Sequence, residues 1–123
     1  MILLDTNAVL YLLGSHPRAG KLAPHAGRLA LSPFVLLELR FLEESGRGRF
    51  IGRAPLKAVR ADARFRIDEP GLLALIESSI ALSWTRDPFD RLIAAHALSR
   101  GWPLATSDAT LIEHLPAKSV LAL

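Results

Sequence analysis

The sequence of 123 residues contains no cysteine, which excludes disulfide bridges and thiolate metal sites. We therefore expect a cytoplasmic protein, because disulfides mark oxidising compartments. No apolar run approaches the roughly 20 residues that a membrane-spanning helix needs. The first residues, Met-Ile-Leu-Leu-Asp, lack the positive start of a signal peptide, so we expect none.

Several common signatures of catalytic sites are also missing. The sequence has no glycine-rich phosphate-binding loop of either common type, and its serines lack the context of a nucleophile elbow. The histidines show no spacing typical of metal ligands, and they are His16, His25, His96 and His114. We expect His96 to serve packing. These absences argue against a nucleotide-binding loop, a catalytic serine and a metal site built from histidines.

The composition is that of a folded domain. Hydrophobic residues make up 50% of the chain and the mean hydropathy is +0.28, which argues against disorder. A length of 123 residues suits a single domain spanning 1–123. Lys and Arg number 15 against 12 Asp and Glu, and the pI is about 10.0.

The basic excess is local and lies between residues 47 and 66. Part of it recurs at helical spacing, which predicts one basic stripe, formed by Arg53, Lys57, Arg60 and Arg64. Such a stripe suits a polyanion. A solvated basic face without a partner is an equally good interpretation of the charge alone.

Segments typical of strands alternate with segments typical of helices. Short apolar runs predict strands at 1–5, 28–31, 65–68, 103–107 and 119–121. Caps and apolar periodicity predict helices at 8–13, 34–45, 55–63, 70–82, 88–100 and 108–114. This alternation predicts an α/β domain with a mostly parallel sheet.

The capping residues fix where several of these helices begin and end. Thr6 and Asn7 can cap the first helix, and Ser32-Pro33 opens the helix over 34–45. Asp87-Pro88 opens the helix that Gly101 ends. Asp87 is thereby explained as a cap.

Four carboxylates lie inside or at the end of apolar runs, and they are Asp5, Glu38, Asp90 and Asp108. A buried charge is costly unless it is paired or bound to a metal. Asp5 and Asp108 follow predicted strands, and open α/β sheets bind ligands at the carboxyl ends of their strands. Thr106 supplies a nearby hydroxyl able to orient a carboxylate or a metal-bound water.

Glu38 is the acid that structure alone explains least well. On a helix, all its neighbours three and four positions away are apolar, namely Phe34, Val35, Phe41 and Leu42. An ion pair with a buried arginine is the structural alternative, but such pairs are weak stabilisers. We favour a functional role, because buried acids with perturbed pKa values cluster at functional sites.

The other three acids each have a structural alternative. Asp5 and Asp108 are candidate N-caps. Asp90 falls in the first turn of its helix, where the helix dipole favours a negative charge. Asp90 also shares a face with Ala94 and Ala97, whose small side chains let another element approach closely.

Taken together, the four acids predict a metal site at one edge of the sheet. Carboxylates gathered there repel one another and raise their own pKa values unless a cation is present. Oxygen-only ligands suit Mg²⁺ or Mn²⁺. Such ions activate water and stabilise charge on a transferring phosphoryl group.

Four segments, in order along the chain, carry a family resemblance: Leu4-Asp-Thr-Asn7, Leu36-Leu-Glu-Leu39, Arg86-Asp-Pro-Phe-Asp-Arg-Leu-Ile-Ala-Ala95 and Thr106-Ser-Asp108. In these segments the chain resembles the PIN-domain ribonucleases, and among them the VapC-type toxins of bacterial toxin–antitoxin pairs. The segment beginning at Arg86 is the most specific. Two departures are the irregular stretch 13–28 and Ser83-Trp-Thr-Arg86, where relatives often have a histidine.

The resemblance implies an α/β/α sandwich and a Mg²⁺- or Mn²⁺-dependent endoribonuclease. The catalytic and metal-binding residues implied, some acting through water, are Asp5, Glu38, Asp90 and Asp108. The supporting residues implied are Thr106, Asp87 and Asn7. It also implies a homodimer that acts on RNA and is silenced by a small VapB-like antitoxin. We expect the basic stripe to bind either the RNA backbone or the antitoxin.

Other function classes stay open. The alternative is a non-catalytic RNA- or protein-binding module that retains the acidic pocket. A haloacid-dehalogenase-type phosphatase would need a second aspartate two residues after the first, where this chain has Asn7. A flap nuclease would need a longer chain and more acids.

Overall fold

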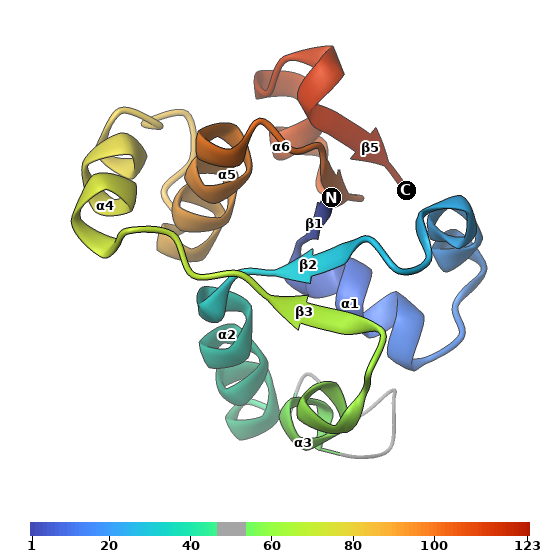
Figure 1. Cartoon of the computed structure of the whole chain (residues 1–123). Coiled ribbons are helices and arrows are strands. Elements are labelled where there is room, and N and C mark those ends of the chain that lie inside the picture. Colours follow the sequence, from blue (N-terminus) through green and yellow to red (C-terminus); the bar gives the residue numbers. More distant parts are fainter. Residues whose placement is uncertain (47–53) are drawn as a thin grey trace.

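The computed structural model describes residues 1–46 and 54–123 (Figure 1). Its centre is one five-stranded sheet in the order β3-β2-β1-β4-β5. All neighbouring strands pair in parallel. The strands are β1 (Ile2–Leu4), β2 (Leu29–Leu31), β3 (Phe65–Ile67), β4 (Leu104–Thr106) and β5 (Val120–Ala122). The predicted α/β fold with a mostly parallel sheet is confirmed.

Helices cover both faces of this sheet. The α-helices are α1 (Thr6–Leu13), α2 (Pro33–Glu44), α3 (Pro55–Ala61), α4 (Leu72–Ile80), α5 (Pro88–Arg100) and α6 (Ala109–His114). Two 3-10 helices, η1 (Pro17–His25) and η3 (Ala117–Ser119), complete the described elements. Figure 1 shows α1, α2 and α3 on one side of the sheet and α4, α5 and α6 on the other.

Most helix boundaries follow the capping residues. Ser32 caps α2 by accepting from the Phe34 N–H, and Asp87 caps α5. Gly101 ends α5 with a φ of 68°, a left-handed conformation that glycine adopts without strain. Of the three candidate caps of α1, Asp5 takes the role by accepting from the Ala8 N–H. Thr6 and Asn7, also expected as possible caps, lie inside the helix.

The predicted basic stripe needs a correction. α3 ends at Ala61, two residues earlier than expected, so Arg64 lies beyond the helix. There its guanidinium pairs with Asp62, with 2.7 Å between Nη2 and Oδ2. Lys57 and Arg60 are exposed on α3, and Arg53 lies outside the described residues. The stripe is therefore interrupted by a local ion pair, which spacing alone did not indicate.

The order of the strands creates a switch point between β1 and β4. The chain builds outward from β1 through β2 to β3, and then returns to place β4 on the other side of β1. Both central strands are fully covered by helices, and Leu3, Leu4, Leu104 and Ala105 have no exposed surface. Open α/β sheets bind their ligands beyond the carboxyl ends of strands at such a point.

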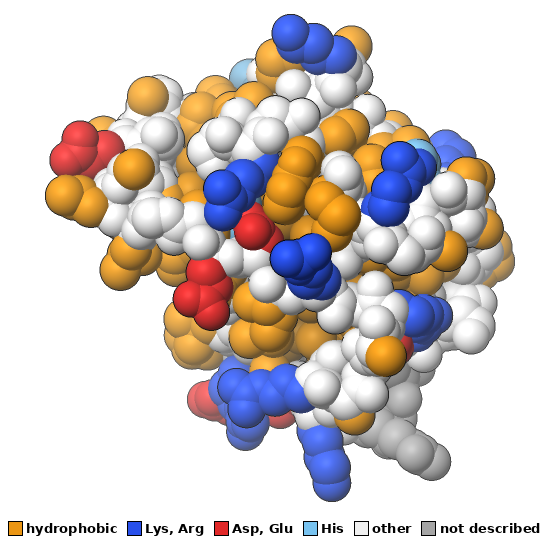
Figure 2. All heavy atoms as spheres, in the orientation of Figure 1, with side chains coloured by type: hydrophobic (Ala, Val, Ile, Leu, Met, Phe, Trp, Pro, Cys, Tyr) orange, Lys and Arg blue, Asp and Glu red, His pale blue; other side chains and the backbone are white. Residues whose placement is uncertain are grey.

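Two surface features complete the fold. α4 exposes four large apolar side chains, Leu72, Leu73, Ile76 and Ile80. Hydrophobic side chains are visible at the left of Figure 2, where α4 lies. The same view shows many Lys and Arg side chains and few acidic ones. None of the helices described is both long enough and apolar enough to cross a membrane.

Candidate active site

A pocket of about 200 Å³ lies where the chain leaves β1 and β4. Its lining consists of Asp5, Thr6, Asn7, Glu38, Leu42, Asp90 and Asp108. The four acids singled out in the sequence thus face one space, although they come from the end of β1, the middle of α2, the start of α5 and the end of β4. Asn7 lines the same pocket.

Asp5 is buried, with 6% of its surface exposed. Burial raises the pKa of its carboxyl to about 6. Hydrogen bonds from the Thr106 hydroxyl and the Ala8 N–H oppose this rise, whereas the charges of Glu38 and Asp108 add to it. Asp5 therefore serves both as the cap of α1 and as a wall of the pocket.

Glu38 lies at the margin of the buried face of α2. That face is centred on Val35 and Leu39, whereas Glu38 is only partly buried and Phe41 is half exposed. Burial raises the pKa of Glu38, a hydrogen bond from the Thr6 hydroxyl to Oε1 lowers it, and the charge of Asp87 raises it. Although its neighbours three and four positions away are apolar, Glu38 is therefore not in the centre of the buried face.

Burial and neighbouring charges both act against the ionised form of Asp90. Burial raises its pKa to about 7, and the charges of Asp87, Asp108, Glu38 and Asp5 add to the rise. Asp87 does not line the pocket; its carboxylate accepts from the N–H groups of Phe89 and Asp90 at the start of α5. Asp87 contributes charge nearby.

Asp108 caps α6 through a 3.0 Å hydrogen bond to its Oδ1 from the Leu111 N–H. Its own N–H donates to Oγ1 of Thr106 at 3.0 Å. Thr106 is fully buried and contacts both strand-end acids, since its hydroxyl also bonds to Asp5. It holds the ends of β1 and β4 in a fixed relation.

Among the described residues, no basic side chain lines the pocket. In residues 1–46 and 54–123, none of the four acids forms an ion pair. The same residues contain no group of three His, Cys, Asp or Glu side chains arranged to hold a metal ion. The donors offered are all oxygens, which fits a hard cation that takes one or two carboxylates directly and keeps several waters.

Sequence reasoning missed Thr6 as a residue of this pocket. Its hydroxyl points to Glu38 and its side chain lines the cavity. The available signal was its position directly after Asp5, at the end of a buried strand. Lys57, Arg60 and Arg64 do not line the pocket.

The fold and the pocket define an α/β protein with an acidic, oxygen-only site at the switch point of a parallel sheet. The PIN domain family matches residues 2–116, so the chain belongs to this family. PIN domains are typically nucleases and usually bind divalent metal ions. No curated protein matches the sequence.

Solved structures share the fold over the whole chain. A toxin–antitoxin complex from Klebsiella pneumoniae has a TM-score of 0.71 at 19% identity, covering 99% of this chain and 97% of that one. VapBC2 from Rickettsia felis, bound to a promoter DNA fragment, has a TM-score of 0.71 at 23% identity, covering 100% and 99%. PAE2754 from Pyrobaculum aerophilum has a TM-score of 0.62 at 28% identity, covering 99% and 87%.

Proposed function

We propose that this protein is a divalent-metal-dependent endoribonuclease, the toxin of a VapBC-type toxin–antitoxin pair. The observation that carries the proposal is the pocket lined by four acids that have no cationic partner within the described part of the chain. Membership of the PIN domain family supports nuclease chemistry. The similarity to solved toxin–antitoxin complexes supports the biological role.

Each acid has a part in this proposal. Asp5 and one or two of Glu38, Asp90 and Asp108 would hold Mg²⁺ or Mn²⁺, in part through water. The remaining acids would position or deprotonate the attacking water. The ion, when bound, activates water and stabilises the charge on the phosphoryl group. Thr6 and Thr106 fix the orientations of Glu38 and Asp5, and Asn7 supplies a further polar contact at the entrance.

The raised pKa values predict how the affinity for metal depends on pH. Without a cation, Asp90 and Asp5 retain protons up to about pH 7 and pH 6, respectively. Binding a cation requires the deprotonated forms, so affinity for metal increases as the pH rises through this range. The electrostatic cost of four neighbouring carboxylates is released when the cation binds.

The direct test is incubation of RNA with the protein and Mn²⁺, with and without EDTA. Asp5→Asn is a suitable inactive variant because asparagine caps a helix as well as aspartate does, so only the charge is removed. Glu113→Gln is the matched control, since Glu113 is exposed on α6. Cleavage that persists in EDTA or in Asp5→Asn contradicts the proposal. RNA binding without metal-dependent cleavage would favour the alternative, a non-catalytic RNA-binding module.

The proposal includes partners and a cytoplasmic location. We propose that the protein forms a homodimer and binds a small VapB-like antitoxin. The exposed apolar side chains of α4 offer area for such contacts, and a second apolar groove runs between α2 and α4 past Phe34, Ile67 and Leu72. Light scattering of the purified chain, and of the chain co-expressed with the product of a small adjacent reading frame, tests both partners.

A further inference from the structure

A cluster of side chains next to the acidic pocket has no part in the reaction proposed above. Asn7 lines the pocket, and Tyr11 lies one turn further along the same face of α1, roughly 5–6 Å away between Cβ atoms. The Tyr11 hydroxyl and Oγ of Ser107 share a 2.9 Å hydrogen bond, and Ser107 directly precedes Asp108. The ring of Tyr11 is therefore tied to the rim of the pocket.

The side chains of His16 and Arg18 pack near the ring of Tyr11. The His16 ring packs on it with 4.5 Å between centroids and a tilt of 30°. Cζ of Arg18 lies 5.9 Å from the centroid of the Tyr11 ring. His16 and Arg18 are exposed, and Tyr11 is partly exposed. We refer to these three side chains as the Tyr11 ledge.

The backbone holds the ledge in a definite conformation. Ser15 has a φ of 52°, the one positive value outside glycine among the residues described. This turn lets the His16 N–H donate to the Tyr11 carbonyl at 2.8 Å. The Arg18 N–H donates to Nδ1 of His16 at 3.1 Å. Because Nδ1 accepts, the neutral ring carries its proton on Nε2, which makes Nε2 a donor for an incoming ligand.

The acidic pocket needs such a neighbour if RNA is the substrate. Its carboxylates repel a phosphate backbone, so affinity for RNA must come from groups around the pocket. Proteins bind single-stranded nucleic acids by stacking bases on aromatic rings and guanidinium planes and by placing cations against phosphates. The Tyr11 ledge offers both kinds of group at the rim.

We propose that the Tyr11 ledge binds an unpaired nucleotide of single-stranded RNA adjacent to the phosphate held at the acidic pocket. The base stacks on the exposed side of His16 and Arg18, and the Arg18 charge contacts the neighbouring phosphate. A base inside a duplex cannot reach such a surface, so the ledge selects unpaired RNA. This inference rests on the proposed nuclease function, because it adds a nucleotide-binding surface beside that site.

The test measures the binding of a fluorescent single-stranded RNA oligonucleotide to the full chain by anisotropy in EDTA, where no metal-dependent cleavage occurs. His16→Ala should weaken binding about tenfold, the effect of losing one stacked base. His25→Ala, at the other end of η1, is the matched control and should stay within about twofold. Circular dichroism verifies that both variants are folded.

The salt dependence of binding tests the part of the guanidinium. Arg18→Gln should reduce the slope of log affinity against log salt by about 0.7, the loss of one phosphate contact on a single strand. Arg28→Gln removes the same charge farther along the chain and should leave the slope unchanged. The duplex of the same sequence should bind all variants alike.

Three results would overturn the ledge: equal effects of His16→Ala and His25→Ala, equal effects on duplex and single strand, or no RNA binding by the wild type. A parallel cleavage assay with Mn²⁺ distinguishes failure of the ledge proposal from failure of the nuclease proposal. Ledge-dependent binding without cleavage would refute the nuclease and leave the ledge. Cleavage with unchanged affinity and KM in His16→Ala would refute the ledge and leave the nuclease.

Discussion

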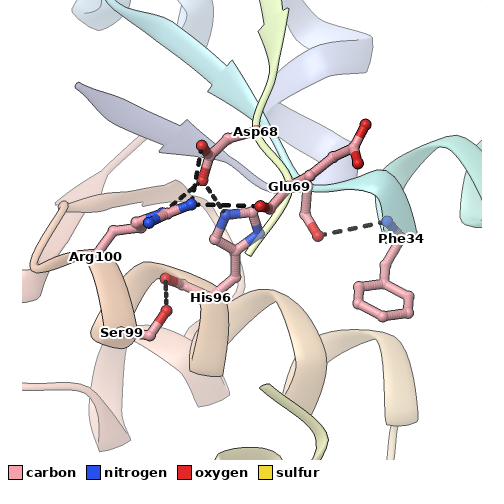
Figure 3. Close-up of polar contacts among 7 residues, drawn as sticks. Phe34, Asp68, Glu69, His96, Ser99 and Arg100 are labelled. Carbon is pink, nitrogen blue, oxygen red and sulfur yellow. Dashed lines mark hydrogen bonds and ion pairs between the residues drawn. The ribbon is translucent and has the colours of Figure 1, made fainter. Parts of the chain in front are cut away.

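Asp68 and the four acids of the pocket lie at the same edge of the sheet and have opposite surroundings. After β3, Asp68 accepts from Nε of Arg100 at 2.8 Å and shares a 2.7 Å hydrogen bond with Nε2 of His96 (Figure 3). After β1 and β4, Asp5 and Asp108 face further acids across the pocket and have no ion-pair partner in the described chain.

The pKa values of the two groups diverge accordingly. Burial raises the pKa of Asp68, but the hydrogen bonds and charges of Arg100 and His96 outweigh it, so the pKa is lowered overall. For Asp5 and Asp90, burial and neighbouring acids act together and raise the pKa. The comparison separates an acid that stabilises the fold from acids that destabilise it unless a ligand binds.

The largest difference between the two groups should appear in activity. Asp90→Asn removes a proposed metal ligand and should lower RNA cleavage by at least ~10²-fold, equivalent to about 3 kcal/mol of transition-state stabilisation. Asp68→Asn should leave the cleavage rate per folded molecule within about threefold of the wild type. Initial rates with Mn²⁺ measure both, and equal losses would remove the distinction.

The second difference concerns stability. Asp68→Ala should lower the free energy of unfolding by about 2 kcal/mol, because it leaves the fully buried His96 ring without its partner. The corresponding decrease in Tm is roughly 8 °C. Glu113→Ala, a change of an exposed acid on α6, should alter the stability by less than about 0.5 kcal/mol. Thermal unfolding followed by circular dichroism measures both, and a change in Tm no larger than that of the control would show that Asp68 has no structural part.

The third difference is the response to metal. At a Mn²⁺ concentration ten times its Kd, the wild type should gain about 1.4 kcal/mol of stability. Asp68→Asn should show the same gain, because Asp68 lies outside the pocket. Asp90→Asn should gain much less. Differential scanning fluorimetry with and without EDTA gives these shifts, and an undiminished gain in Asp90→Asn would place the metal elsewhere.

The smallest expected difference is in pH dependence without metal. The folded pKa of Asp90 is about 7 and its ordinary value is 3.8, so between these values the folded state binds more protons than the unfolded state. Stability therefore falls as the pH rises through this window. Allowing for solvent screening of this partly exposed group, Asp90→Asn should be more stable than the wild type by about 1 kcal/mol at pH 8.

At pH 4 this difference between Asp90→Asn and the wild type should largely vanish. Asp68 has the opposite sign: its lowered pKa contributes stability that is present above pH 3.8 and is lost as the pH falls below that value. Unfolding curves in EDTA between pH 3 and pH 8 measure both effects. A pH-independent difference for Asp90→Asn would mean that its carboxyl is not perturbed in the folded state.

Part of this contrast was predictable from the sequence and part was not. The strand-end positions of Asp5 and Asp108 followed from short apolar runs, and Ser32 and Asp87 fixed the starts of α2 and α5. His96 was expected to serve packing, and it is fully buried. Its hydrogen bond with Asp68 crosses 28 positions in the sequence, and no periodic pattern indicates such a contact.

The errors in the sequence prediction have local physical causes. Asp5, Thr6 and Asn7 are all good caps, so the sequence left them as alternatives at the start of α1. Asp5 takes the role, and β1 ends one residue before it. The basic stripe was extended to Arg64, but the chain turns after Ala61 and Asp62 captures the guanidinium. The spacing of residues does not show where a helix ends.

By itself, the sequence determined the α/β class, the parallel sheet and the identity of the acids at its edge, because apolar runs, caps and motif order are local properties of the chain. Only the tertiary structure decided which acid pairs with a basic side chain and which acids face one another. Electrostatic compensation depends on distances between α2, α5 and the strand ends, and these are fixed by packing across the whole fold. The Tyr11 ledge likewise exists only because Tyr11 and Ser107, 96 positions apart, are brought together.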